Sequence, residues 1–218
     1  MSGPRFKEIR WTYGFNDVAI APGLVTVNPD QTDITFTLGD HTFNIPMMAS
    51  AMDAVVSPAF AIRMGELGGL AALNLEGVWA RYEDSEGVLA GIAETPQDEV
   101  MGLLRTIYNA PIQESLVGQR VQEIKEGGVL CSVAVTPQNT KRLAPLAVEA
   151  GADILVVQST VTTARHISKS YRGLVFSELV QQMDVPVVVG NCVTYGAALE
   201  LMETGVSGIL VGVGPGAA

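Results

Sequence analysis

Several residue types that mark other protein classes are scarce in this 218-residue sequence. It contains two cysteines and two histidines, and Cys131 and Cys192 both lie inside apolar runs. That usage provides neither a disulfide framework nor metal-ligand spacing, and it fits a reducing compartment. No apolar run approaches the roughly 20 residues that span a bilayer, and residues 1–10 lack the apolar segment of a signal peptide. We therefore expect a cytoplasmic protein without a membrane partner.

Positive charge is scarce as well. Lys and Arg number 13 against 23 Asp and Glu, so the formal net charge is −10. The basic residues are scattered, and aromatic residues make up only 6% of the chain, which leaves no stripe of rings for base stacking. Because an acidic chain repels a phosphate backbone, we expect no nucleic-acid partner. Any phosphate must be held by a local group.

Apolar residues are abundant: they make up 48% of the chain, enough for one large core. Short runs rich in Val and Ile alternate with helix-length segments, a pattern typical of a parallel sheet. The predicted strands are residues 45–50, 70–74, 129–135, 154–159, 186–190 and 208–213. The predicted helices are residues 57–67, about 95–126, 140–150, 176–183 and 195–204.

Strands that are apolar on both faces, in this order, predict an α/β fold, a (β/α)8 TIM barrel of which the first six βα units are present. The rival is a doubly wound open sheet, whose dinucleotide fingerprint should follow the first strand. Here the first strand ends in Ser50-Ala51-Met52-Asp53, without the required glycines. We expect one catalytic barrel domain over residues 1–218, with an N-terminal extension at 1–44, a barrel part at 45–218 and the C-terminal units absent from this chain.

Glycines cluster after the last predicted strand. Gly212, Gly214 and Gly216 alternate with other residues directly after the apolar run 208–211. Because glycine tolerates positive φ and exposes its backbone groups, such a loop can wrap a phosphate, a cation or a flat ring. A tight structural turn is the simpler alternative.

Four motifs, in this order along the chain, resemble those of a known family. They are Tyr13-Gly14-Phe15-Asn16-Asp17-Val18, Ser50-Ala51-Met52-Asp53 with Leu67-Gly68-Gly69-Leu70, Gly190-Asn191-Cys192-Val193-Thr194, and Gly212-Val213-Gly214-Pro215-Gly216. On these residues the chain resembles the IMP dehydrogenase/GMP reductase family. The resemblance implies a TIM barrel, in which most dehydrogenases carry a CBS pair between the second and third strands. The interval between Asn74 and Val129 is too short for that pair, so the chain resembles the CBS-less, IMP-dehydrogenase-related branch.

The resemblance also implies a catalytic cysteine in the glycine loop, which attacks C2 of the purine nucleotide before hydride transfer. The loop here ends in Ala217 and Ala218, and the cysteine is expected immediately after Ala218. The chain itself therefore contains no expected catalytic residue. Cys192 is a poor substitute, because no neighbouring His or Lys in the sequence would lower its pKa, and we expect it to be buried packing.

For the substrate, the resemblance assigns Ser50 and Met52 to the nucleotide pocket. The hydroxyl would reach the ribose or phosphate, and the polarizable thioether would pack on the purine. Met52 as core filler is the alternative. Ala217 stands where relatives place a serine that holds the phosphate. Asp53 could cap the following helix or pair with a cation, and it is left out of the predicted site.

The cofactor residues depart from the family pattern. Gln158-Ser159-Thr160 replaces an Asp followed by two small hydroxyl residues, so the riboside loses a charged acceptor. Asn191 either contacts the nicotinamide or nucleotide or stabilises the turn into the next helix. The resemblance adds Gly212 and Gly214 on the cofactor side, and the carbonyls of Gly214 and Gly216 as ligands of a monovalent cation, K⁺.

We therefore expect NAD-dependent oxidation of IMP to XMP through a cysteine-linked intermediate, in guanine nucleotide biosynthesis. Two alternatives stay open: NADPH-dependent reduction of GMP, and a non-catalytic paralogue that only binds purine nucleotides. The family resemblance further implies a homotetramer.

Overall fold

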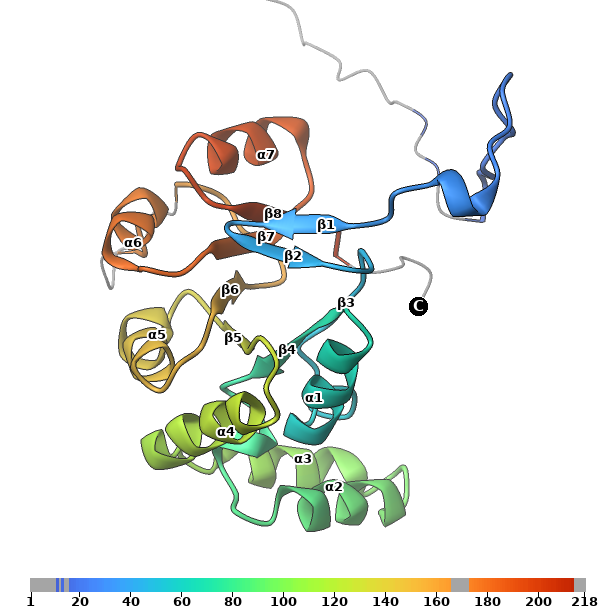
Figure 1. The fold of residues 1–218 in the computed structure, drawn as a ribbon. Helices are drawn as coiled ribbons and strands as arrows, with labels where there is room; N and C mark the ends of the chain where they lie inside the picture. Colours follow the sequence, from blue (N-terminus) through green and yellow to red (C-terminus); the bar gives the residue numbers. More distant parts are fainter. Residues whose placement is uncertain (1–10, 12, 14–15, 166–172, 214–218) are drawn as a thin grey trace, which may run out of the picture.

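The chain forms a parallel sheet whose strands lie side by side in sequence order. The structure is a computed structural model and describes residues 11, 13, 16–165 and 173–213. Each strand pairs in parallel with the next one along the chain, as successive βαβ units do. The six strands are β3 (Met48–Ala49), β4 (Leu70–Asn74), β5 (Ser132–Val135), β6 (Ile154–Gln158), β7 (Val187–Cys192) and β8 (Gly208–Val211) (Figure 1). Every predicted strand range overlaps one of them, and β7 extends two residues beyond its predicted end at Gly190.

Helices pack against the outer face of this sheet (Figure 1). They include α1 (Pro58–Glu66), α4 (Glu114–Glu126), α5 (Thr140–Glu149), α6 (Phe176–Gln182) and α7 (Tyr195–Met202). The helix α1 begins where predicted because the Ser57 hydroxyl accepts a hydrogen bond from the Phe60 amide at 3.0 Å. Thr194 caps α7 in the same way. None of the helices in the described ranges has the length and apolar character needed to cross a membrane.

The prediction of one long helix over about 95–126 is wrong. The interval between β4 and β5 holds a short 3-10 helix, η2 (Val78–Ala80), and then α2 (Ser85–Glu94), α3 (Val100–Asn109) and α4. Ala110 is extended because Pro111 follows it, and this separates α3 from α4. The helix α2, which lies outside the predicted helices, is capped by Asp84. The interval predicted to be too short for a CBS pair holds only these short helices.

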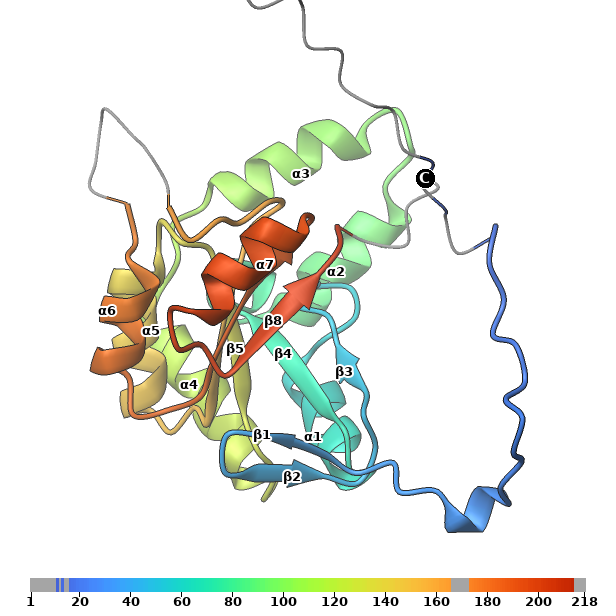
Figure 2. The same cartoon turned by 90° about the horizontal axis from the view of Figure 1, so that it is seen from above.

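Part of the predicted N-terminal extension is an antiparallel hairpin, made by β1 (Phe36–Leu38) and β2 (His41–Phe43) and preceded by the 3-10 helix η1 (Pro29–Gln31). Leu38 pairs with His41, and Gly39 takes a positive φ of 58° at the first position of the turn, as a type II′ turn requires. The hairpin lies across the amino-terminal ends of the strands (Figure 2). Leu38 and Phe43 are buried there, so the hairpin packs against the sheet and covers the amino-terminal ends of its strands.

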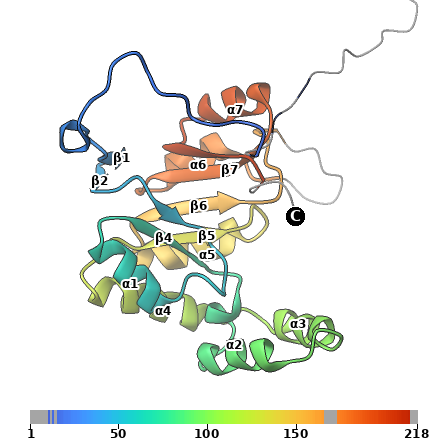
Figure 3. The same cartoon turned by 90° about the vertical axis from the view of Figure 1, so that its right-hand side faces the viewer.

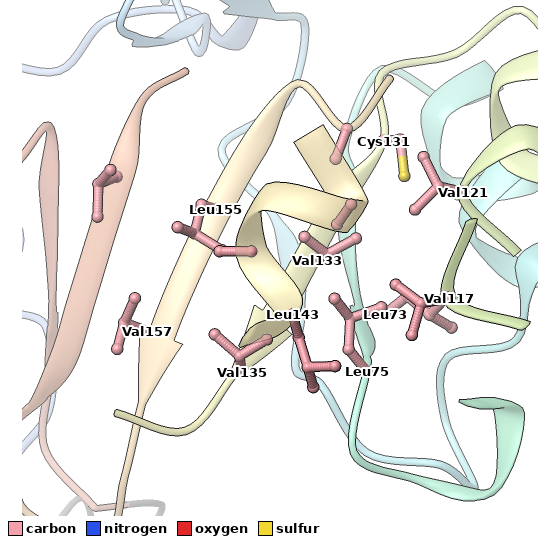
Figure 4. Close-up of a cluster of buried hydrophobic side chains, with 14 of the residues drawn as sticks. Leu73, Leu75, Val117, Val121, Cys131, Val133, Val135, Leu143, Leu155 and Val157 are labelled. Atoms are coloured by element: carbon pink, nitrogen blue, oxygen red, sulfur yellow. The ribbon is translucent and has the colours of Figure 1, made fainter. Parts of the chain in front are cut away.

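Side chains of the sheet pack in two separate clusters because alternate residues point to opposite faces. The outer cluster lies between the strands and the helices. Figure 4 shows part of it, including Leu73, Val133 and Leu155 from neighbouring strands, Val117 and Val121 from α4, and Leu143 from α5. The inner cluster contains Leu70, Ala72, Ala134, Ile154, Val156 and Val188, together with Leu38 and Phe43 of the hairpin. The inner strands β4, β5, β6 and β7 are thus buried on both faces, as the sequence predicts, whereas the edge strands β3 and β8 are only partly buried.

The sheet curves toward its inner face. Met48 of the edge strand β3 and Leu210 of the opposite edge strand β8 line the same apolar cavity of about 230 Å³ above the hairpin. Opposite edges of a flat six-stranded sheet would lie far apart. The curved parallel sheet is a half-barrel, consistent with a TIM-barrel-like fold.

Candidate functional site

A second cavity, of about 260 Å³, lies at the carboxyl-terminal ends of the strands. Ligands of α/β barrels bind at this end. Polar groups reach it from Ser50 after β3, from Gln158 at the end of β6 and from Asn191 near the end of β7, while Gly212 follows β8. The other lining residues are Met48, Ala49, Ala51, Ala72, Val156, Leu210 and Val213. Since none of these described lining residues is charged, the cavity suits an uncharged ring or sugar better than a phosphate.

Four of the predicted ligand-binding residues therefore meet in one place. Ser50, Gln158, Asn191 and Gly212 are far apart in the sequence and come from four different strand ends. Gly212 has a φ of 92°, which an L-amino acid rarely adopts. Its backbone therefore takes a path at the cavity wall that requires glycine.

Gln158 and Asn191 form an amide pair. The Gln158 Nε2 donates to Asn191 Oδ1 at 3.3 Å. Two backbone hydrogen bonds hold the strands in place beside them: the Ser159 amide donates to the Gly190 carbonyl at 2.9 Å, and the Asn191 amide donates to the Ser159 carbonyl at 3.1 Å. Within the described residues, Gln158 Oε1 and Asn191 Nδ2 have no partner, so the pair presents one acceptor and one donor. A ribose hydroxyl or a carboxamide matches such a pair.

The Asn191 side chain lines the cavity, while the turn into α7 is capped by Thr194. Thr162, which is not among the predicted residues, stabilises the loop after β6. Its hydroxyl donates to the Gly190 carbonyl, and its amide donates to the Asn191 carbonyl at 2.8 Å. A buried threonine in a polar loop gives no recognisable sequence pattern.

Three predicted residues do not line the cavity. Met52 is 53% exposed, so the alternative that it fills the core is wrong. It follows Ser50 by two residues in the same loop. The Ser159 hydroxyl bonds within its own loop, to the Val161 carbonyl at 2.9 Å and to the Thr162 hydroxyl at 2.8 Å. Thr160 is exposed. Ser159 therefore shapes the loop, and Thr160 faces solvent.

The remaining predicted residues, Gly214, Gly216 and Ala217, lie outside the described residues, as does the position after Ala218. Within the described ranges, no group of three or more His, Cys, Asp or Glu side chains is arranged to hold a metal ion.

Both cysteines are buried, at 1% exposure each. Burial raises the pKa of the Cys131 thiol to about 12, with a further rise from Asp153 and a smaller opposing effect of Lys125. A nucleophilic cysteine needs access and a lowered pKa. Neither Cys131 nor Cys192 lies open to a substrate, which agrees with the packing role expected for Cys192.

Asp53 has a structural role that differs from both predicted ones. Its carboxylate is buried and accepts hydrogen bonds from the Asn74 side chain at 3.2 Å, the Val78 amide at 2.9 Å and the Tyr108 hydroxyl at 2.6 Å. Burial, and then the hydrogen bond to Asp53, raises the pKa of Tyr108 above its usual value. Asp53 therefore does not cap α1, and its carboxylate oxygens are bound by protein donors instead of a cation. It joins the loop after β3 to the helical interval between β4 and β5.

Comparison with known proteins decides the family. Residues 12–218 match the model of the IMP dehydrogenase / GMP reductase domain. The chain belongs to the IMP dehydrogenase/GMP reductase family. This family is one of oxidoreductases.

The sequences of several relatives align with nearly the whole of this IMP dehydrogenase/GMP reductase family chain. An uncharacterized oxidoreductase of Mycolicibacterium smegmatis is 39% identical over 213 residues, covering 95% of this chain and 57% of its own length. An inosine-5'-monophosphate dehydrogenase of Cryptosporidium parvum is 28% identical, covering 96% and 53%. The crystal structure of an IMP dehydrogenase/GMP reductase-like protein from Corynebacterium glutamicum superposes with a TM-score of 0.87 at 34% identity, covering 95% and 56%. The chain thus spans a little over half the length of these relatives.

Proposed function

We propose that this protein is an NAD-dependent oxidoreductase that converts IMP to XMP. The observation that carries the proposal is the convergence of Ser50, Gln158, Asn191 and Gly212 on one uncharged cavity at the carboxyl ends of the strands. We further propose that the six strands are the first six of an eight-stranded barrel.

The proposed nucleotide-binding residues differ from the proposed cofactor-binding residues. The Ser50 hydroxyl donates to a ribose or phosphate oxygen of the nucleotide, and the exposed Met52, two residues later in the sequence, packs on the purine ring. The Gln158 and Asn191 amides orient the nicotinamide riboside, and the bound nicotinamide supplies the hydride acceptor. Gly214 and Gly216 are proposed carbonyl ligands for K⁺. Since Cys131 and Cys192 are buried, the proposal assigns the nucleophile to neither.

The uncharged Gln158 sets an expectation for cofactor affinity. A carboxylate accepts hydrogen bonds about twice as strongly as a neutral carbonyl. With an amide at this position, paired to Asn191, the riboside is held more weakly. We therefore expect a high KM for NAD. The same observation favours a second candidate, a paralogue that binds the nucleotide without turning it over.

Two absorbance assays at the reduced-nicotinamide band test the proposal with full-length protein: IMP with NAD, and GMP with NADPH. We expect NADH to form in the first and no change in the second. Consumption of NADPH with GMP and no reaction with IMP would identify a GMP reductase. No reaction in either assay, with IMP still bound in a calorimeter, would identify the non-catalytic paralogue.

A substitution tests the pocket. Ser50→Ala should raise the KM for IMP about tenfold, the scale of one hydrogen bond to a ligand. Ser177→Ala is the matched control, because Ser177 is exposed on α6, on the outer face of the sheet. Equal KM values for IMP in the two variants would remove Ser50 from the nucleotide site.

A further inference from the structure

The loop that carries Ser50 and Met52 shares a buried anchor with α3. We propose that Tyr108, acting through Asp53, is a positioning residue for the nucleotide loop, which comprises residues 50–56, so that the hydrogen bond from the Tyr108 hydroxyl controls how well this loop binds nucleotide. The proposal rests on the proposed function of Ser50 and Met52, and it adds a residue 55 positions away in sequence to that site.

The nucleotide loop is compact. The Met52 amide donates to the Ser50 carbonyl at 2.8 Å, and the amides of Val55 and Val56 both donate to the Met52 carbonyl at 2.9 Å. These bonds tie the loop to itself. Two residues attach it to the rest of the molecule: Val56, which is buried in the outer cluster, and Asp53, which lies in the middle of the loop.

Asp53 is held on both its side chain and its backbone. The residue is 9% exposed, its carboxylate accepts three hydrogen bonds, and the Trp79 indole donates to the Asp53 carbonyl at 3.3 Å. A buried carboxylate is costly unless its oxygens are satisfied. The loop therefore keeps this conformation only while the donors stay in place.

The three donors to the carboxylate differ in what holds them. Asn74 is the last residue of β4, and Val78 begins η2 and is fully buried, so both are held firmly in place. Tyr108 comes from α3, and its hydroxyl makes the shortest of the three bonds, at 2.6 Å. Hydrogen bonds from a hydroxyl to a charged oxygen are short and strong. The shortest of the three hydrogen bonds thus comes from α3, a helix with a single buried residue.

The helices α2 and α3 project from the half-barrel. Figure 3 shows them beyond α1 and α4, on the side toward which the strand arrows point. Near its carboxyl end, α3 is fastened by the Tyr82 hydroxyl, which donates to the Ile107 carbonyl at 3.1 Å, and by Arg81, which donates to the Ala110 carbonyl. Ile107 is the single residue of α3 that is fully buried. Little apolar area therefore fixes α3, and its docking depends on these polar bonds.

Docking of α3 and order in the nucleotide loop are linked through one hydrogen bond. When α3 is docked, all three donors satisfy Asp53, and the loop presents Ser50 to the cavity. When Tyr108 leaves, the carboxylate loses a donor and the loop populates other conformations. The affinity for a ligand falls in proportion to the fraction of protein in the competent conformation.

The test compares Tyr108→Phe with Tyr82→Phe in the full-length protein. Each variant loses one hydroxyl bonded at the carboxyl end of α3, but only the Tyr108 hydroxyl reaches Asp53. We expect Tyr108→Phe to raise the Kd for IMP about fivefold, with the KM for NAD unchanged, whereas Tyr82→Phe leaves the Kd for IMP within about twofold of wild type. Equal effects of the two variants would show a general loosening of α3 and overturn the proposal.

Hydrogen exchange without any nucleotide separates this proposal from the proposed function. Amides of residues 51–56 should exchange several-fold faster in Tyr108→Phe than in wild type or Tyr82→Phe. Unchanged exchange rejects the link between Tyr108 and the loop, even if the wild type oxidises IMP. If the wild type has no affinity for IMP or GMP, the proposed function fails, while the exchange rates still decide whether Tyr108 holds the loop.

Discussion

Replacing Gly77 by alanine should destabilise the protein through a single steric contact. A Cβ at this position would lie 1.7 Å from Asp53 Oδ1 and 2.4 Å from both the carboxyl carbon and Oδ2. The backbone of Gly77 has φ −92° and ψ −164°, values open to any residue. The effect of Gly77→Ala is therefore displacement of the Asp53 carboxylate, without backbone strain.

The size of the effect follows from what the carboxylate must leave. Moving it to van der Waals distance breaks or lengthens its bonds to Asn74, Val78 and Tyr108. A hydrogen bond to a charged group contributes about 1.5–3 kcal/mol, and overpacking costs about 1–3 kcal/mol because the surroundings relax. We expect Gly77→Ala to lower the free energy of unfolding by about 3 kcal/mol.

Gly91→Ala is the matched control. Gly91 lies in the interior of α2, and a Cβ there meets nothing within 4 Å. Alanine in place of glycine inside a helix stabilises by about 0.5–1 kcal/mol. Urea unfolding of both full-length variants, followed by circular dichroism, measures the two changes. A Gly77→Ala protein as stable as wild type would refute the steric argument, and so would a loss of the same size in Gly91→Ala.

Three further predictions concern the core, a thiol and the cofactor. Leu155→Ala, at a side chain with no exposure in the outer cluster, should cost about 2–5 kcal/mol in the same urea experiment, and a loss under about 1 kcal/mol would contradict the close packing there. Cys131 should resist a thiol reagent at pH 8 until the protein unfolds, and rapid labelling of the native protein would argue against its burial. Because burial raises the pKa of this thiol from 9.0 to about 12, its contribution to the free energy of unfolding is complete below pH 9 and is lost as the pH rises toward 12. Gln158→Asp should lower the KM for NAD several-fold in the absorbance assay while the KM for IMP stays the same, since a carboxylate binds a sugar diol more strongly than an amide does, and an unchanged KM for NAD would remove Gln158 from the cofactor site.

Local features of the sequence were enough to locate most of the fold. Apolar runs mark the strands because a parallel sheet is buried on both faces. Ser57 and Thr194 mark helix starts because their hydroxyls bond to amides three residues ahead. The hairpin can also be recognised in the sequence, because Gly39-Asp40, a dipeptide typical of tight turns, lies between the short segments 36–38 and 41–43, each with an aromatic residue and a β-branched one. Pro111, likewise visible in the sequence, marks the break between α3 and α4.

The site divides differently. The sequence by itself determined the family, through motifs at strand ends, and so selected Ser50, Gln158, Asn191 and Gly212 as neighbours of a ligand. Only the tertiary structure decided that the four line one uncharged cavity, that Ser159 and Thr160 lie outside it, and that Asp53 accepts a hydrogen bond from Tyr108. Helix caps, turns and strand burial depend on residues close in sequence, so their patterns can be recognised there. The partners of a buried carboxylate are set by which distant segments the fold brings together, and no local pattern records that.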